Sequence, residues 1–176
     1  HRTMETGAYT KEGVTPSISP SMDIQVSSNF ERALFDAYDR EGSVVAQLME
    51  DLKDGSFTIS QGAMEMLREN FASGRASEDE TTATIKSEYA ASGEVLCPHS
   101  AVGVKVGNEH LSSVPMITLA TAHPAKFPDA VEAAMGTRPG LPPHMADMMD
   151  KEERVCKVPN QLVLLETLIK DRIAAR

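Results

Sequence analysis

The stretch ITLATAHPAKFPDAVEAAM, residues 117–135, reads as a short apolar strand, then a turn that contains His123 and Lys126, and then a helix. The apolar run predicts a strand over 115–120, and the amphipathic pattern after the turn predicts a helix over 127–135. Strand–turn–helix units of this kind are typical of parallel α/β sheets. The stretch therefore favours an α/β fold.

A second unit of the same kind lies upstream. Residues 94–97 are expected to form a short strand, and the loop CPHSA, residues 97–101, follows it. The valines of 100–109 alternate as in a strand, but the Pro-His-Ser lead-in favours a helix there. Ligands of parallel α/β folds bind beyond the carboxyl ends of the strands, so the two loops are the candidate site.

The remaining chain is predicted to be mostly helical, with an irregular start over the first two dozen residues. One capping box is expected at Ser28 and Glu31, and another at Ser77 and Glu80. Four further helices are predicted. The first follows Gly42, and the second covers 62–71 with Phe71 inward. The third begins after Ser77 with Ile85 and Tyr89 inward, and the last begins near Asn160. Few short parallel strands among many helices indicate a helix-rich α/β chain that forms part of a larger sheet.

Composition bounds the function. The 176 residues carry a net charge of −9, which argues against nucleic acid or an anionic membrane as a general partner. There is no apolar run long enough to span a membrane, and the start lacks the apolar core of a signal peptide. Cys97 and Cys156 are expected to be reduced thiols of a cytoplasmic protein. The scattered His and Cys residues predict no metal site.

Thr121, His123 and Lys126 are the candidate binding residues, because a hydroxyl, an imidazole and an ammonium within six residues suit an anionic or heteroaromatic ligand. The alternative is structural: Thr121 ends a strand, His123 shapes the turn, and Lys126 is solvated. A nucleophile–base pair of Ser100 and His99 is disfavoured, because adjacent side chains rarely point at each other. Ser100 is better explained as a helix cap.

Three motifs together carry a resemblance to a known family. They are SPSMDIQVSSNFERALFD (19–36), CPHSAVG (97–103) and LATAHPAKFPDAV (119–131), and RTMETGAY (2–9) is similar to the segment that precedes them. In order and spacing they resemble the C-terminal motifs of threonine synthase of the bacterial and fungal type. That family often has an aspartate where this chain has Cys97.

The resemblance implies a tryptophan-synthase-β-like (fold type II) pyridoxal-phosphate enzyme, which converts O-phospho-L-homoserine and water to L-threonine and phosphate. It implies that Thr121 faces the pyridine nitrogen of the cofactor and that His123 and Lys126 line the substrate pocket. No catalytic residue is assigned within the chain. Ser21, Asp23 and Asn29 belong to a family motif, but polar residues before a helix also organise turns.

The Schiff-base lysine of the family lies upstream of every motif present here. Residues 1–176 are therefore expected to be the C-terminal portion of the catalytic region, inactive alone, with the N-terminal part of the same chain as its partner. Two alternatives stay open. One is another pyridoxal-phosphate lyase of the same fold, and the other is a helical interaction module without an active site.

Overall fold

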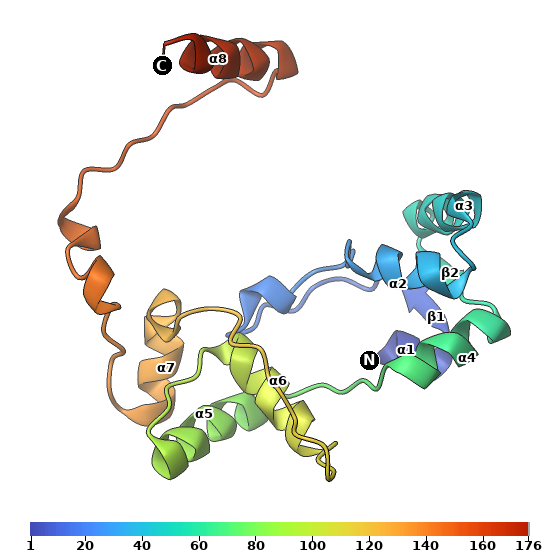
Figure 1. Ribbon diagram of the computed structural model, residues 1–176, viewed down its shortest axis with the longest axis horizontal. Helices are drawn as coiled ribbons and strands as arrows, with labels where there is room; N and C mark the ends of the chain where they lie inside the picture. Colours follow the sequence, from blue (N-terminus) through green and yellow to red (C-terminus); the bar gives the residue numbers. More distant parts are fainter. Residues whose placement is uncertain (176) are drawn as a thin grey trace. The chain divides into compact units, whose positions relative to one another are not determined.

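The computed structural model describes residues 1–175. The chain divides into two compact units, one over His1–Gly140 and another that begins at Leu141. Figure 1 shows the helices and strands of both units along the chain. The described elements are mainly helical, as the sequence predicts.

Six elements enclose the first of two hydrophobic clusters in the first unit. They are α1 (Arg2–Thr6), β1 (Ala8–Thr10), α2 (Phe30–Ala37), α3 (Gly42–Lys53), β2 (Ser56–Thr58) and α4 (Gln61–Asn70). Leu34 and Leu67 are completely buried in this cluster. Tyr9 stacks on Phe30 and on Phe57, with ring centroids 5.8 and 5.2 Å apart. Aromatic stacking thus ties β1 to α2 and β2.

The two strands pair antiparallel, with Tyr9 opposite Phe57. The prediction of parallel strands is therefore wrong for residues 1–175, and so is the irregular start, where α1 and β1 form. Residues 94–97 and 115–120 are not strands either. An extended segment becomes a strand only when a neighbouring backbone completes the ladder, and neither segment has such a neighbour in the described part of the chain.

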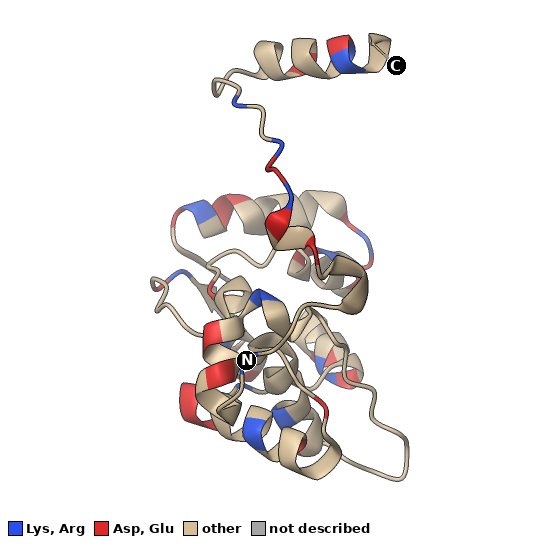
Figure 2. Ribbon diagram, turned by 90° about the vertical axis from the view of Figure 1, so that its left-hand side faces the viewer, with Lys and Arg blue, Asp and Glu red and all other residues tan. Residues whose placement is uncertain are grey.

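Three helices build the second cluster: α5 (Glu78–Ser92), α6 (Pro98–Asn108) and α7 (Pro128–Met135). Ile85, Ala101 and Ala134 are its buried centre. The helix prediction over 100–109 is confirmed, although α6 begins slightly earlier, with Pro98 at its first position. Figure 2 shows acidic and basic residues on the same helices.

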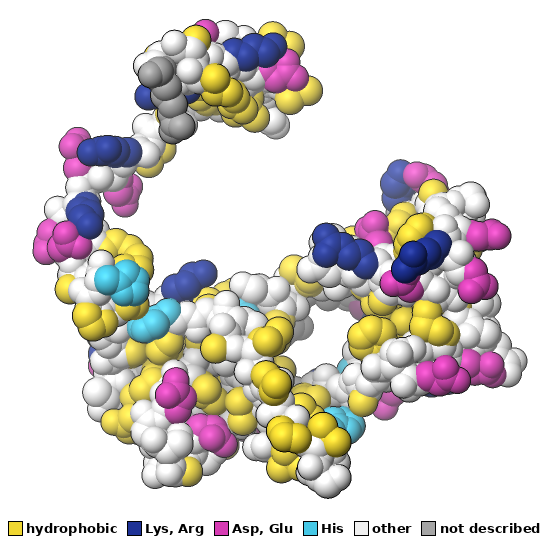
Figure 3. Space-filling model, viewed as in Figure 1, with side chains coloured by type: hydrophobic (Ala, Val, Ile, Leu, Met, Phe, Trp, Pro, Cys, Tyr) yellow, Lys and Arg dark blue, Asp and Glu magenta, His cyan; other side chains and the backbone are white. Residues whose placement is uncertain are grey.

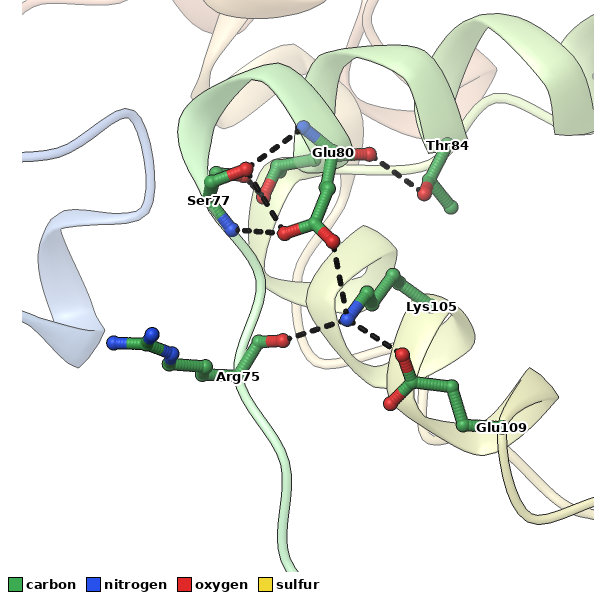
Figure 4. Close-up of polar contacts among 7 residues, drawn as sticks. Arg75, Ser77, Glu80, Thr84, Lys105 and Glu109 are labelled. Carbon is green, nitrogen blue, oxygen red and sulfur yellow. Dashed lines mark hydrogen bonds and ion pairs between the residues drawn. The ribbon is translucent and has the colours of Figure 1, made fainter. Parts of the chain in front are cut away.

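A polar network joins the start of α5 to α6 (Figure 4). Ser77 and Glu80 form the predicted capping box, and the Ser77 hydroxyl accepts a hydrogen bond from the Glu80 N–H at 3.2 Å. Lys105 of α6 pairs with Glu80 at 3.3 Å and with Glu109 at 2.7 Å, and it donates to the Arg75 carbonyl at 3.0 Å. The Ser77 backbone and hydroxyl, with Lys105, lower the pKa of Glu80 to about 2.

Residues 109–121 return along α6. A Cβ on Gly103 would lie 3.0 Å from the Thr118 methyl, and one on Gly107 would lie 3.4 Å from the Met116 Cγ. The two glycines therefore let the returning chain approach the helix closely. The apolar side chains of this segment remain exposed; Ile117, for example, is 81% exposed.

Several local expectations fail at helix ends. The residue before α2 is Asn29, which makes no side-chain capping hydrogen bond, so Ser28 is not the cap. Phe71 follows α4 and is 54% exposed, while Tyr89 is 39% exposed, so neither points inward. Their positions fit the apolar period, but the described chain covers these two side chains only in part.

The second unit contains two short 3-10 turns, η3 (Pro143–Met145) and η4 (Met148–Asp150), and the helix α8 (Leu162–Ala174). The predicted last helix is confirmed. Most of its apolar residues are exposed, and Figure 3 shows yellow side chains on the face of this helix that is in view. No helix in the described residues is long and apolar enough to cross a membrane.

Candidate functional site

The two loops singled out by the sequence meet at the first turn of α6. Cys97 occupies the N-cap position, and its Sγ accepts a hydrogen bond from the Ser100 N–H at 3.4 Å. Ser100 therefore lies in the first turn rather than at the cap, which corrects the expectation from sequence. A thiol accepts hydrogen bonds weakly, so Pro98 at the first helical position, with its fixed backbone angle, contributes to starting the helix.

The Ser100 hydroxyl links this turn to the second loop. Its Oγ accepts a hydrogen bond from the Thr121 N–H at 3.2 Å and lies 3.3 Å from the Cys97 Sγ. Because a backbone N–H can only donate, the Ser100 hydroxyl proton is free to point at the sulfur. Ser100 is only 3% exposed, so this contact is sealed from solvent.

His99 lies beside Ser100 and is also buried, at 6% exposed. Its Nε2 lies 3.0 Å from the Ser21 N and accepts the hydrogen bond of that amide. A neutral imidazole that accepts at Nε2 carries its proton on Nδ1, and Nδ1 is buried without a partner among the described residues. Neither side chain is thus aimed at the other, and Ser100 with His99 is no nucleophile–base pair.

The His99 ring contacts the far end of the second loop. Its centroid is 4.6 Å from that of Phe127, and the Lys126 Nζ lies 5.9 Å from the Phe127 centroid. Burial lowers the pKa of His99, the positive charge of Lys126 lowers it further, and the carboxylate of Asp23 opposes the change. His99 is therefore held in its neutral form.

The three residues chosen from the sequence all lie on the exposed side of this loop. No hydrogen bond of the Thr121 hydroxyl is found within residues 1–175, so the hydroxyl is available to a ligand. The His123 Nδ1 accepts the Ala125 N–H at 3.2 Å and caps a 3-10 turn, η2 (Pro124–Lys126). His123 thus shapes the turn, as the structural alternative predicts, and its Nε2 makes no hydrogen bond within residues 1–175.

Sequence reasoning missed the supporting contacts. Asp23 accepts hydrogen bonds from the Ser17 N–H at 2.7 Å and from the Ser17 hydroxyl at 2.8 Å. Asp23 therefore organises a turn, which is the structural role that the sequence also allowed for the polar residues before α2. That turn presents the Ser21 N–H to His99. Both loops were recognised as motifs, but the hydrogen bond from Ser21 to His99 crosses 78 residues and leaves no local signal.

The site contains no metal centre in the part of the chain that is described: no group of three His, Cys, Asp or Glu side chains could hold an ion. Its chemistry is that of a hydroxyl, an imidazole nitrogen and an ammonium around an open loop. Such a loop can orient a heteroaromatic ring nitrogen and attract an anionic group.

Comparison with known proteins gives a consistent result. Residues 100–169 match the family described as threonine synthase, C-terminal. Threonine synthase from Pseudomonas aeruginosa is 45% identical over 173 residues, which is 96% of this chain and 37% of that protein. Threonine synthase from Saccharomyces cerevisiae is 36% identical over 154 residues, 76% of this chain and 30% of that protein.

Solved structures agree. The crystal structure of PLP-bound threonine synthase from Brucella melitensis matches with a TM-score of 0.86 and 49% identity, over 97% of this chain and 37% of that one. The yeast enzyme matches with a TM-score of 0.82 and 30% identity, over 99% of this chain and 40% of that one.

The fold is therefore the C-terminal part of the tryptophan-synthase-β-like, fold type II class, helix-rich and with few strands. Within this class the chain is similar to threonine synthases of both bacteria and fungi, and residues 100–169 match the C-terminal model of that family. The chain spans about a third of the length of the curated relatives named above, 37% of the Pseudomonas aeruginosa protein.

Proposed function

We propose that this chain is the C-terminal portion of a threonine synthase, a pyridoxal-phosphate-dependent lyase that converts O-phospho-L-homoserine and water to L-threonine and phosphate. The observation that carries the proposal is the match over 97% of the chain, at 49% identity, to a threonine synthase that was crystallised with pyridoxal phosphate. In this reading the substrate class is a phosphorylated hydroxy-amino acid, and the product serves amino-acid biosynthesis in the cytoplasm.

Thr121 is the proposed contact to the pyridine nitrogen. Its exposed position, its hydroxyl without a partner in residues 1–175 and its anchored backbone support this role. When bound, pyridoxal phosphate supplies an electron sink for carbanion chemistry. A hydroxyl, unlike a carboxylate, does not force the ring nitrogen to stay protonated, so Thr121 would moderate that sink.

His123 and Lys126 are the proposed wall of the substrate pocket. The Lys126 ammonium gives the loop a positive charge in a protein of net charge −9, which suits a phosphorylated substrate. The His123 Nε2 can donate a hydrogen bond to a substrate oxygen, while its Nδ1 accepts the hydrogen bond that maintains the turn. Neither is assigned a proton-transfer step.

The covalent cofactor lysine is proposed to lie in an N-terminal part of the same protein, outside residues 1–176. That part is the proposed partner of the exposed apolar surface, which includes Ile117 at 81% and Leu119 at 74% exposure. Exposed apolar surface of this extent marks interaction sites in soluble proteins. Association with nucleic acid or with a membrane is not proposed, because the chain is acidic.

The experiment uses the full-length protein that carries this sequence, incubated with pyridoxal phosphate and O-phospho-L-homoserine. Phosphate and threonine are expected to appear in equal amounts. If the cofactor binds but no threonine forms, the substrate assignment falls and another lyase of the same fold replaces it. If no cofactor binds, the enzyme proposal is wrong and a helical interaction module takes its place.

A further inference from the structure

The loop from Thr121 to Phe127 is held at both ends by two neighbouring residues of α6. Ser100 binds the Thr121 N–H at 3.2 Å, and the ring of His99 packs against that of Phe127 at 4.6 Å. Between these two anchors the loop is partly buried, but the candidate ligand-binding side chains that it carries are exposed. The first turn of α6 therefore sets the position of a loop that follows it by about twenty residues in sequence.

The anchor at Thr121 is the more specific of the two. The Ser100 Oγ is fixed by its own place in the helix, since the Ser100 N–H is bound to the Cys97 Sγ at 3.4 Å, and the Oγ lies 3.3 Å from the same sulfur. Ser100 is only 3% exposed, which limits the competition of water for its hydroxyl. One oxygen, fixed in a helical turn, thus determines where the Thr121 backbone can lie.

We propose that Ser100 is a positioning residue for Thr121, which fixes the backbone from which the Thr121 hydroxyl reaches the pyridine nitrogen of pyridoxal phosphate. This inference rests on the proposed function. Ser100 touches neither cofactor nor substrate in this account; it acts only through the hydrogen bond to Thr121. Small displacements of a positioned group cost large factors in rate, so a lost anchor should change the cofactor environment without removing any group that contacts it.

The first measurement tests the anchor itself, by hydrogen exchange of a peptide containing Thr121 in the full-length protein. Ser100→Ala should make the exchange of the Thr121 amide about five- to tenfold faster. The loss of one neutral hydrogen bond raises the population of the open, exchange-competent state by about this factor. Ser100→Thr keeps the hydroxyl and should restore slow exchange. The matched control is Ser112→Ala, because the Ser112 Oγ also accepts a backbone N–H, that of Val114 at 3.1 Å, in an exposed turn.

The second measurement is the absorbance spectrum of the bound cofactor. Ser100→Ala should shift the spectrum in the same direction as Thr121→Ala, the double variant should shift it no further than Thr121→Ala, and Ser100→Thr should restore it. Ser112→Ala should leave it unchanged. Non-additivity of this kind shows that two residues act through one contact.

The outcomes separate the two claims. Unchanged exchange in Ser100→Ala overturns the anchor. Faster exchange with an unaltered spectrum, while Thr121→Ala does alter it, shows that the contact serves stability alone, and the positioning role is then wrong. An unaltered spectrum in Thr121→Ala overturns the cofactor contact in the proposed function, and the positioning role falls with it even if the exchange result confirms the hydrogen bond.

Discussion

A single backbone amide determines which ring nitrogen of His99 carries the proton. Because Nε2 accepts the Ser21 N–H at 3.0 Å, protonating the ring would bring two donors together and break this hydrogen bond. Burial and the nearby Lys126 ammonium act in the same direction and lower the pKa of His99. The neutral ring therefore joins the Asp23 turn to α6, and acid should separate them.

His99→Gln tests this at the level of the residue, since the Gln carbonyl can accept where Nε2 does but cannot be protonated. A lowered pKa means that the unfolded chain binds a proton more readily than the folded one, so stability is complete above pH 6.5 and decreases as the pH falls below it. The variant should remain within about 1 kcal/mol of the parent at pH 8. It should then lose less stability between pH 6.5 and pH 5, measured by thermal unfolding; equal losses in both proteins would contradict the assignment.

The loop that carries the candidate ligand-binding residues could be singled out from sequence, but the contacts that support this loop could not. Thr121, His123 and Lys126 stand within six residues of one another, so the loop is visible as a motif. The hydrogen bond from Thr121 to Ser100 spans 21 residues and depends on how α6 and the returning chain pack. No local pattern encodes that contact.

Helices were predicted more successfully than strands for a physical reason. A capping box is contained within four residues, so both of its members, Ser77 and Glu80, can be seen in the local sequence. A strand is stabilised by another segment, and β1 and β2 lie far apart in the chain, each only three residues long. Residues 115–120 have the composition of a strand but no ladder partner among the described residues, so the pattern alone was misleading.

The polar network at the start of α5 gives a prediction at the level of the element. Glu80→Gln should lower the melting temperature, and the loss should depend on pH because the pKa of Glu80 is lowered from 4.5 to about 2. A carboxylate with a lowered pKa contributes fully above the unfolded value and loses its contribution as the pH falls toward the folded value. The difference between parent and variant should therefore be constant above pH 5 and shrink between pH 4.5 and pH 2.

Two companion variants make this test specific. Asp79→Asn removes a neighbouring acid of the same first turn. This variant loses only the interaction of a carboxylate with the helix dipole, so its melting temperature should fall less than that of Glu80→Gln. Ser77→Ala removes the N-cap oxygen and should cost about 1 kcal/mol. A difference between parent and Glu80→Gln that does not change with pH would show that the network contributes nothing through the charge of Glu80.

At the scale of the whole molecule, the exposed apolar side chains are the feature that the described chain does not explain by itself. Ile117 and Leu119 are exposed in the first unit, and Leu162 and Val163 of α8 are each about 70% exposed in the second. Burial of such side chains stabilises a protein by roughly 1.5–3 kcal/mol each. Their exposure agrees with the proposal that further parts of the same protein cover them.

The general architecture was predictable because the motifs occur in order over nearly the whole chain. The helix-rich α/β class and the family were both predicted from sequence and are confirmed by the solved relatives. The antiparallel pairing was not predicted, because α1 and β1 lie in a stretch rich in Gly and Pro signals, and the stacking of Tyr9 on Phe57 that accompanies the pairing is a tertiary contact.

The central claim is that residues 1–176 contribute the pyridine-facing wall of a pyridoxal-phosphate site whose covalent lysine lies elsewhere in the protein. The most direct measurement is borohydride reduction of the full-length protein loaded with pyridoxal phosphate, followed by peptide mass mapping. We expect one labelled lysine outside this sequence and no label on any of its eight lysines. A stoichiometric label on Lys126, or on another lysine of this chain, would contradict it.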